Sequence, residues 1–204
     1  MREAAQSGRP RVGLALGAGG ARGWAHLGVL RRLDELGVPI DCVAGTSAGA
    51  LVGAVYLAGR LDLLEALSRR LDWCQMARLF FEVNFPRSGL LTGRNVARFL
   101  QEVVGVDMIE ALDRPFAAVA TDLLAHHERV FTQGGLIDAI RASISIPGVF
   151  TPARCGDRDL VDGALVNPLP VSVLRAMGAA RIIAVDVNLR PGTGSETAPA
   201  PADA

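Results

Sequence analysis

The chain has 204 residues, 50% of them hydrophobic, and carries 21 basic and 21 acidic side chains, so its formal net charge is zero. This length suits one domain with a substantial core, and a neutral chain lacks the basic surface that nucleic acid requires. We therefore expect one globular domain over residues 1–190, no nucleic-acid partner, and a disordered tail over residues 191–204, where Gly, Ala, Pro and Thr dominate.

The N-terminal part of the chain predicts the opening of an α/β fold. A short apolar run at residues 11–16 is typical of a buried parallel strand, and a glycine-rich loop follows it at residues 17–23. Apolar positions at helical spacing predict a helix over residues 24–36, and residues 40–44 form the next strand. Because loops gather at the carboxyl ends of strands in such folds, both glycine motifs should lie at one edge of the sheet.

Further helices and strands are predicted along the rest of the chain. The expected helices cover residues 48–58, 61–71, 92–105, 136–143 and 167–177. The expected strands cover residues 116–121, 129–132, 159–161 and 181–187, the last of them buried. Residues 73–85 fit neither pattern, and their phenylalanines indicate either core or an apolar rim for a hydrophobic substrate.

Cysteine usage and hydropathy indicate a cytoplasmic protein. Cys42, Cys74 and Cys155 lie far apart with no C-x-x-C pair, which is typical of reduced thiols and not of disulfides or a metal site. Residues 1–10 lack the apolar core of a secretory signal. The longest nearly apolar stretch, residues 48–59, falls short of the ~20 residues that span a bilayer. Peripheral contact with the inner membrane face stays open.

Residues 45–49 read Gly-Thr-Ser-Ala-Gly and lie between a predicted strand and a predicted helix. G-x-S-x-G in this context is the pattern of a nucleophile elbow, in which the chain turns sharply and exposes the serine. Gly45 and Gly49 let neighbouring backbone pass without Cβ clashes. Ser47 is therefore the candidate nucleophile.

The glycine-rich segment at residues 19–23 follows the first strand and precedes a helix, so its N–H groups can bind negative charge. A dinucleotide site would need G-x-G-x-x-G and an acidic residue at the end of the second strand. Here Arg22 occupies the sixth position, and Asp41 lies at the beginning of that strand. The oxyanion of an acyl-transfer intermediate is favoured, because Ser47 lies on the next strand turn. Arg22 either orients the segment, attracts an anionic head group or is simply solvated.

A serine nucleophile needs a base, and the residues leave two arrangements open. Hydrolases of the α/β type run Ser, then Asp or Glu, then His, but no histidine follows Asp162. Asp122 with His126 or His127 would complete a triad, although histidines are ordinary in a polar connection. His26, just after the glycine-rich segment, more often packs or hydrogen-bonds locally in such a position.

In the second arrangement Asp162 itself takes the serine proton. It ends a short apolar strand before Gly163, although Asp-Gly is also a common structural turn. A carboxylate pKa near 3.9 against about 6.5 for histidine leaves roughly 3.5 kcal/mol less driving force. Oxyanion donors contribute about 2.7 to 4 kcal/mol each, so a strong glycine-rich segment offsets this deficit.

Three motifs, in this order, resemble those of the patatin-like phospholipases: residues 19–23, residues 45–49, and Asp-Gly-Ala at residues 162–164. The likeness extends to residues 120–123, 141–147 and 167–170, and covers most of the chain from residue 11 to about residue 188. The chain is most similar to short bacterial members related to the esterase domain of neuropathy target esterase. Ala18 and Ala164 stand where many relatives have glycine, and relatives often continue beyond the strand at residues 181–187.

The resemblance implies a three-layer α/β/α fold with a mainly parallel central sheet, and hydrolysis of lipid esters such as phospholipids or lysophospholipids. It implies a catalytic dyad of Ser47 and Asp162 and no metal or organic cofactor. It also implies an oxyanion hole formed by Gly19, Gly20, Ala21 and Arg22. The rivals are a non-catalytic lipid-binding member of the same fold and, third, a nucleotide-binding protein.

Overall fold

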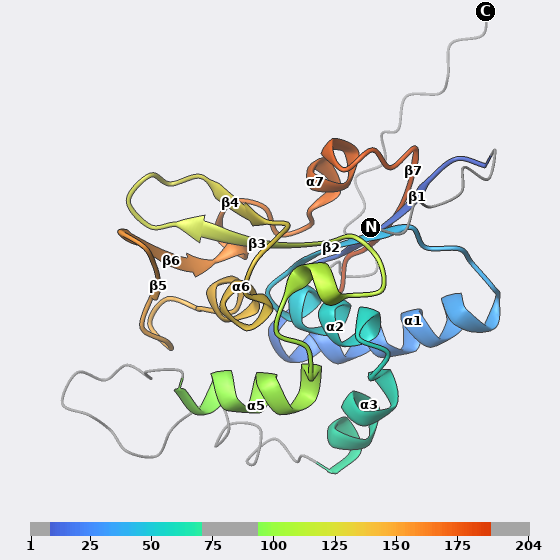
Figure 1. The fold of residues 1–204 in the computed structure, drawn as a ribbon, viewed down its shortest axis with the longest axis horizontal. Helices are drawn as coiled ribbons and strands as arrows, with labels where there is room; N and C mark the ends of the chain where they lie inside the picture. Colours follow the sequence, from blue (N-terminus) through green and yellow to red (C-terminus); the bar gives the residue numbers. More distant parts are fainter. Residues whose placement is uncertain (1–8, 71–93, 189–204) are drawn as a thin grey trace, which may run out of the picture.

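The fold is built around a seven-stranded sheet in a computed structural model that describes residues 9–70 and 94–188 (Figure 1). The strands are β1 (Val12–Leu16), β2 (Cys42–Thr46), β3 (Phe116–Asp122), β4 (Glu128–Phe131), β5 (Ala153–Cys155), β6 (Arg158–Asp162) and β7 (Arg181–Val185). The α-helices are α1 (Ala25–Glu35), α2 (Ala48–Leu57), α3 (Leu61–Arg70), α5 (Arg94–Val104), α6 (Leu136–Ser143) and α7 (Val171–Ala176). The short 3-10 helices are η1 (Gly20–Trp24), η2 (Ile109–Ala111) and η3 (Gly163–Leu165).

Parallel pairing holds the centre of the sheet. The strand order is β5-β6-β3-β2-β1-β7, and β4 pairs with β3 off this path. β1 pairs in parallel with β2 and β7, and β2 pairs in parallel with β3, so four neighbouring strands point the same way. Antiparallel pairs join β4 and β6 to β3 and β5 to β6. The prediction of a mainly parallel central sheet is confirmed.

Helices cover both faces of this sheet, because successive strand residues point to opposite sides. Leu14 and Val43 belong to a large core with α1, α2, α5 and α6. Ala15 and Ala44 pack on the other side with Leu174 of α7. Figure 1 shows α7 on one side of the sheet and α1, α2 and α6 on the other. Strands that are covered on both faces have continuous apolar sequences, and this is the pattern from which the buried parallel strands were predicted.

α2 is almost wholly buried and lies directly against the sheet. Its residues are nearly all small or apolar, and a helix that is apolar all round belongs inside a protein. Small side chains let it approach closely, since a Cβ at Gly53 would lie 3.1 Å from Val43 Cγ1. The start of α2 is therefore held firmly at the end of β2, where the elbow lies.

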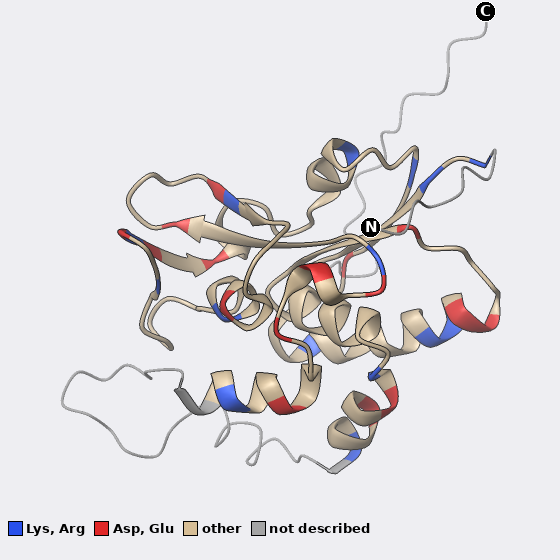
Figure 2. Cartoon of the chain, in the orientation of Figure 1, with Lys and Arg blue, Asp and Glu red and all other residues tan. Residues whose placement is uncertain are grey.

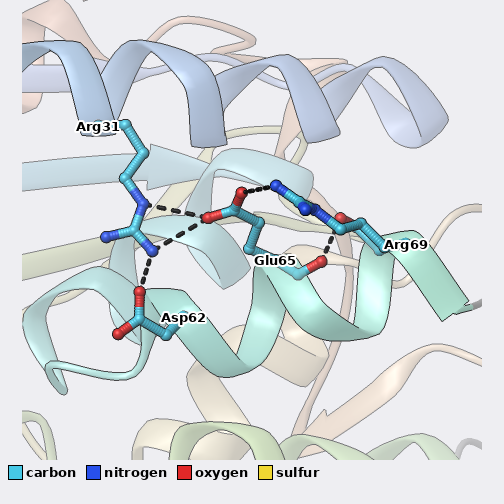
Figure 3. Close-up of polar contacts among 5 residues, drawn as sticks. Arg31, Asp62, Glu65 and Arg69 are labelled. Carbon is cyan, nitrogen blue, oxygen red and sulfur yellow. Dashed lines mark hydrogen bonds and ion pairs between the residues drawn. The ribbon is translucent and has the colours of Figure 1, made fainter.

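Ion pairs at the surface link α3 to α1. Arg31 of α1 contacts Asp62 and Glu65 of α3, and Arg69 bonds Glu65 from the next turn (Figure 3). The hydrogen bond from Arg69, and to a smaller extent that from Arg31, holds the pKa of the Glu65 carboxyl below its usual range. Because exposed pairs of this kind are individually weak, α3 depends mainly on buried side chains such as Leu64.

Some elements differ from their predicted bounds. β2 begins and ends two residues later than the predicted strand at residues 40–44, so it leads directly into Ser47. The sequence does not predict β5, because it has three residues of which two are exposed. β7 is partly exposed although residues 181–187 read as a buried strand, because β7 lies at the end of the strand order. Most of the glycine-rich segment, from Gly20 onward, belongs to the 3-10 helix η1, and Gly19 precedes this helix as its N-cap.

Several predictions lie outside the described residues, namely those on the apolar residues 73–85, on the first two residues of the predicted helix 92–105, on Cys74 and on the tail at residues 191–204. Cys42 and Cys155 are free thiols. Charged side chains of both signs are spread over the helices and connections (Figure 2). Within residues 9–70 and 94–188, no helix has the length and hydropathy of a membrane span.

Candidate active site

β2 and β6 meet end to end along one edge of β3. Thr46 of β2 pairs with Val119, and the next residue of β3, Ala120, pairs with Asp162 of β6. β4 pairs with both Val119 and Ala120, so it occupies the opposite edge. β2 runs parallel to β3 and β6 runs antiparallel, so the carboxyl ends of β2 and β6 face each other. Ser47, the residue after β2, therefore lies beside Asp162.

Ser47 turns the chain from β2 into α2 with a backbone conformation of φ 55° and ψ −121°, which side-chain-bearing residues rarely adopt. Backbone packs closely on both sides of this turn. A Cβ at Gly49 would lie 2.1 Å from the Leu16 carbonyl oxygen, and one at Gly45 would lie 2.4 Å from the Gly49 carbonyl oxygen. The elbow therefore requires both glycines of the motif.

The hydroxyl of Ser47 donates a hydrogen bond to Oδ2 of Asp162 at 2.5 Å. Both residues are buried, with 5% and 4% of their surfaces exposed. Oδ1 of Asp162 accepts the Ala164 N–H at 2.8 Å, which orients the carboxylate at the start of η3. Burial raises the pKa of the Asp162 carboxyl, and the hydrogen bonds from Ser47 and Ala164 oppose this shift only in part. The structure thus joins the two residues that the sequence indicates as nucleophile and base.

The η1 segment packs on the elbow. A Cβ at Gly23 would lie 2.4 Å from the Cβ of Ala48, the residue after the candidate nucleophile. Gly20 has φ +52°, in the left-handed region that favours glycine. Among the described residues, the N–H groups of Gly19, Gly20 and Ala21 have no hydrogen-bond partner. Donors of this kind are available to a negatively charged ligand.

Arg22 contributes differently from the other members of this segment. Its N–H donates to the Gly19 carbonyl at 3.0 Å and is therefore engaged inside the segment. Its guanidinium donates to Oδ1 of Asn188 at 3.1 Å, and the Asn188 amide donates to the Ala18 carbonyl at 2.6 Å. The Arg22 side chain is thus linked through Asn188 to Ala18, and the Arg22 N–H is not a free backbone donor.

His26 lies at the start of α1 and is fully buried. Its Nε2 lies 2.8 Å from the carbonyl oxygen of Gly17, so this nitrogen carries the proton and donates it. Burial lowers the pKa of the imidazole and favours its neutral form. The expectation of a histidine that packs and hydrogen-bonds locally is confirmed.

The residues of the alternative triad are engaged elsewhere. Oδ2 of Asp122 accepts from Arg158 at 2.8 Å, and Oδ1 accepts two backbone N–H groups of the following turn. His126 and His127 are exposed in that turn, and His127 Nδ1 contacts a carbonyl oxygen of the same turn. The Ser47 hydroxyl bonds a different carboxylate. The structure therefore does not bring these histidines and the serine together.

Two serines that the sequence did not single out contact the pair. Ser143 Oγ accepts the Ser47 N–H at 2.8 Å, and the Ser145 carbonyl accepts the Asp162 N–H at 2.9 Å. Both lie in the stretch 141–147, and its resemblance to the family was the only signal for them. Serine near a helix end has many ordinary roles, so spacing alone does not identify such contacts.

The polar groups assembled here are a hydroxyl on a strained turn, a buried carboxylate and a set of backbone N–H donors. In the described ranges, no group of three His, Cys, Asp or Glu side chains is placed to hold a metal ion. A serine elbow of this kind at the carboxyl end of a parallel strand is typical of α/β acyl hydrolases.

A family model described as patatin-like phospholipase matches residues 14–175. The chain belongs to the patatin-like phospholipase family. The matched region includes η1, the elbow and β6, so every residue of the site lies inside it.

Curated relatives support the same assignment. A neuropathy target esterase (NTE) family protein of Mycobacterium tuberculosis is 43% identical over 194 residues, which are 95% of this chain and 52% of the relative. Neuropathy target esterase of Drosophila melanogaster is 35% identical over 89% of this chain and 13% of its own length. Patatin-like phospholipase domain-containing protein 6 of Homo sapiens is 36% identical over 91% of this chain and 14% of its own length. The chain thus spans about half the length of the mycobacterial relatives and less of the animal ones.

The fold also matches a solved structure. VipD from Legionella pneumophila superimposes with a TM-score of 0.51 over 79% of this chain and 47% of VipD, at 15% sequence identity. At this identity the likeness concerns the fold alone. The three-layer α/β/α architecture expected from the sequence is confirmed.

Proposed function

We propose that this chain hydrolyses carboxylic esters of lipids, phospholipids or lysophospholipids, through a dyad of Ser47 and Asp162. The observation that carries the proposal is the 2.5 Å hydrogen bond from the Ser47 hydroxyl to the Asp162 carboxylate at the apex of the elbow. Membership of the patatin-like phospholipase family supports a lipid acyl hydrolase in general. The η1 donors beside the serine support the same chemistry.

In the proposed reaction, Asp162 Oδ2 takes the Ser47 proton as Ser47 Oγ attacks the ester carbonyl carbon. Negative charge develops on the carbonyl oxygen, where the N–H groups of Gly19, Gly20 and Ala21 stabilise it. As the intermediate collapses, Asp162 gives its proton to the leaving alcohol and the acyl group stays on Ser47. Water then attacks the acyl-enzyme with Asp162 as base, and the fatty acid leaves.

The electrostatics of the site support a carboxylate as the base. Burial raises the pKa of Asp162, so its carboxylate is a stronger base than one in water. An ordinary aspartate is weaker than histidine by roughly 3.5 kcal/mol of driving force. One oxyanion donor contributes about 2.7 to 4 kcal/mol, so the η1 donors are sufficient to offset that difference.

A fluorophosphonate probe and a soluble p-nitrophenyl ester test the proposal. The wild-type protein should be labelled at Ser47 and should hydrolyse the ester, and Ser47→Ala should lose both activities. A folded wild-type protein that reacts with neither would favour the alternative, a non-catalytic lipid-binding member of the family. Full esterase activity in Asp162→Asn would exclude the dyad. Loss of activity only in the double variant His126→Ala with His127→Ala would favour the triad.

We also propose that the edge of the molecule that carries Ser47 and Asp162 makes peripheral contact with a lipid surface. In a cytoplasmic protein this surface would be the inner face of the membrane. Leu165 and Val166 follow Asp162 within four residues, and Ile146 follows Ser145, whose carbonyl bonds Asp162. All three are exposed large apolar side chains. Exposed apolar groups beside a site for lipid esters suit a substrate that is embedded in lipid.

A further inference from the structure

We propose that Ser143, the last residue of α6, is a positioning residue for the nucleophile, and that its hydroxyl takes the place of one hydrogen bond in the β2–β3 ladder. The inference rests on the proposed function, in which Ser47 is the nucleophile. It concerns a residue whose hydroxyl bonds two backbone groups, the Ser47 N–H and the Val119 carbonyl, and that acts through the backbone of Ser47.

The ladder between β2 and β3 shows where the hydroxyl is inserted. Val43 N–H donates to the Pro115 carbonyl at 3.0 Å. Four residues further along both strands lie the Ser47 N–H and the Val119 carbonyl, which would bond directly in a regular parallel ladder. Instead, Ser143 Oγ accepts the Ser47 N–H at 2.8 Å and donates to the Val119 carbonyl at 2.6 Å.

The inserted hydroxyl lies where β6 meets β2. At Gly163, directly after β6, a Cβ would lie 2.2 Å from the Val119 carbonyl oxygen, so the chain passes very close to this point. If the Ser47 N–H bonded the Val119 carbonyl directly, the end of β2 would lie closer to β3 at this junction. Ser47 would then shift relative to Asp162, which is held separately by its own pairing with β3.

The hydroxyl also stabilises an unfavourable backbone. The conformation of Ser47 is strained, and a buried N–H left without a partner would add the cost of its lost hydration. Ser143 is fully buried, so solvent does not reach this N–H from the helix side. Removal of the hydroxyl therefore leaves the Ser47 N–H without its partner.

The same helix end also holds the other member of the pair. The Asp162 N–H donates to the Ser145 carbonyl at 2.9 Å, two residues beyond Ser143. One short segment thus contacts the backbone of both Ser47 and Asp162. Reacting groups supported by rigid secondary structure keep their geometry better than groups carried by loops.

Ser143→Ala tests the inference through kinetics and amide exchange. We expect kcat on a soluble p-nitrophenyl ester and the rate of fluorophosphonate labelling to fall by about ten- to a hundred-fold, because misplacement of about 1 Å has effects of this size. KM should change by less than about two-fold, since the lost contact does not touch the substrate. Hydrogen exchange at the Ser47 amide should accelerate, because its acceptor is gone.

Ser68→Ala is the matched control, because its hydroxyl also donates to a backbone carbonyl, that of Glu65 at 2.7 Å, on a helix remote from the site. It should keep the wild-type labelling rate. Thermal melts define a temperature at which every variant is fully folded, so lost stability does not imitate lost positioning.

A folded Ser143→Ala with wild-type labelling, kcat and Ser47 exchange would overturn the inference. So would a kcat that falls only in proportion to the folded fraction. If the wild-type protein is not labelled at all, the proposed function fails. Exchange at the Ser47 amide still decides whether Ser143 holds that backbone.

Discussion

Burial makes Asp162 a stronger base and also a destabilising group in the fold. With 4% of its surface exposed, the residue has lost most of its hydration, and its pKa is raised. A group with a raised folded pKa stabilises the protein below its unfolded pKa, about 3.9 for aspartate, and this contribution is lost as pH rises through the folded pKa. At neutral pH the ionised carboxylate is therefore less favourable than a neutral group of the same shape.

We expect Asp162→Asn to be more stable and much less active than the wild-type protein. The amide can keep the contacts with Ser47 and Ala164 without a buried charge, so Tm at pH 8 should rise, by about 2–4 °C for each kcal/mol gained. The gain should shrink as pH falls toward about 4. The kcat should fall by about 10²- to 10⁴-fold, the usual contribution of a general base. Thermal melts across this pH range would contradict this view of Asp162 if the variant were less stable at pH 8.

His26 should make stability depend on pH in the opposite direction. Its folded pKa is lowered, mainly by burial, so below about pH 6.5 the unfolded chain binds a proton that the folded protein does not. The free energy of unfolding should therefore fall on acidification, by at most about 1.4 kcal/mol per pH unit. His26→Gln keeps a donor for the Gly17 carbonyl without titrating, so its stability should fall less between pH 8 and 5.5. Identical pH dependence in urea unfolding of both proteins would contradict this assignment.

At the scale of elements, the elbow depends on how closely α2 approaches β1. A Cβ at Gly49 would lie 2.1 Å from the Leu16 carbonyl oxygen, whereas a Cβ at Gly28, inside α1, would meet no described atom within 4 Å apart from its chain neighbours and the backbone of its own helix. Both glycines are helical, so alanine has the same intrinsic helix preference at either position. The two substitutions therefore separate local packing from helix propensity.

Gly49→Ala should lower the free energy of unfolding by about 1–3 kcal/mol or more, because backbone atoms must move. It should also reduce fluorophosphonate labelling, since the same movement displaces Ser47. Gly28→Ala should raise the free energy of unfolding by about 0.5–1 kcal/mol and leave labelling intact. Urea unfolding checks both values. Equal effects of the two substitutions would mean that close approach of the backbone at Gly49 does not exclude a larger residue from the elbow.

How well each element could be predicted depends on whether its signal is local. The elbow is encoded in five consecutive residues, so the sequence identifies Ser47 and both glycines without knowledge of the sheet. The partner Asp162 required the resemblance, because local residues left a triad with Asp122 open. Ser143 escaped notice because its contact with Ser47 spans 96 residues and arises only when α6 packs beside the β2–β3 junction.

At the scale of the whole molecule, the two ends of the parallel strands differ in character. At the starts of β1 and β2, Asp41 accepts the Val12 N–H and pairs with Arg9, a structural arrangement. This agrees with the prediction that Asp41 lies at the wrong edge for a nucleotide ribose. At the carboxyl ends lie Ser47, η1 and the exposed apolar side chains that follow β6. The candidate site thus shares its edge with several exposed apolar side chains.

This asymmetry makes the proposed membrane contact testable. Leu165 is 61% exposed beside the site, while Leu36, 58% exposed, follows α1 on the connection to the start of β2. Transfer of a leucine side chain from water to an apolar environment contributes about 1.5–3 kcal/mol, and 1.4 kcal/mol is a factor of ten in affinity. We expect Leu165→Asp, combined with Ile146→Asp, to weaken sedimentation with phosphatidylcholine vesicles by about ten-fold or more.

Leu36→Asp carries the same kind of change at the opposite end of the strands and should bind vesicles as the wild-type protein does. Activity should follow binding, so the double variant should lose more activity on vesicle substrate than on a soluble ester. If all three proteins sediment equally, the apolar side chains beside Asp162 do not meet the lipid surface. Selective loss in the double variant would instead mean that the edge carrying Ser47 and Asp162 is also the edge that faces the membrane.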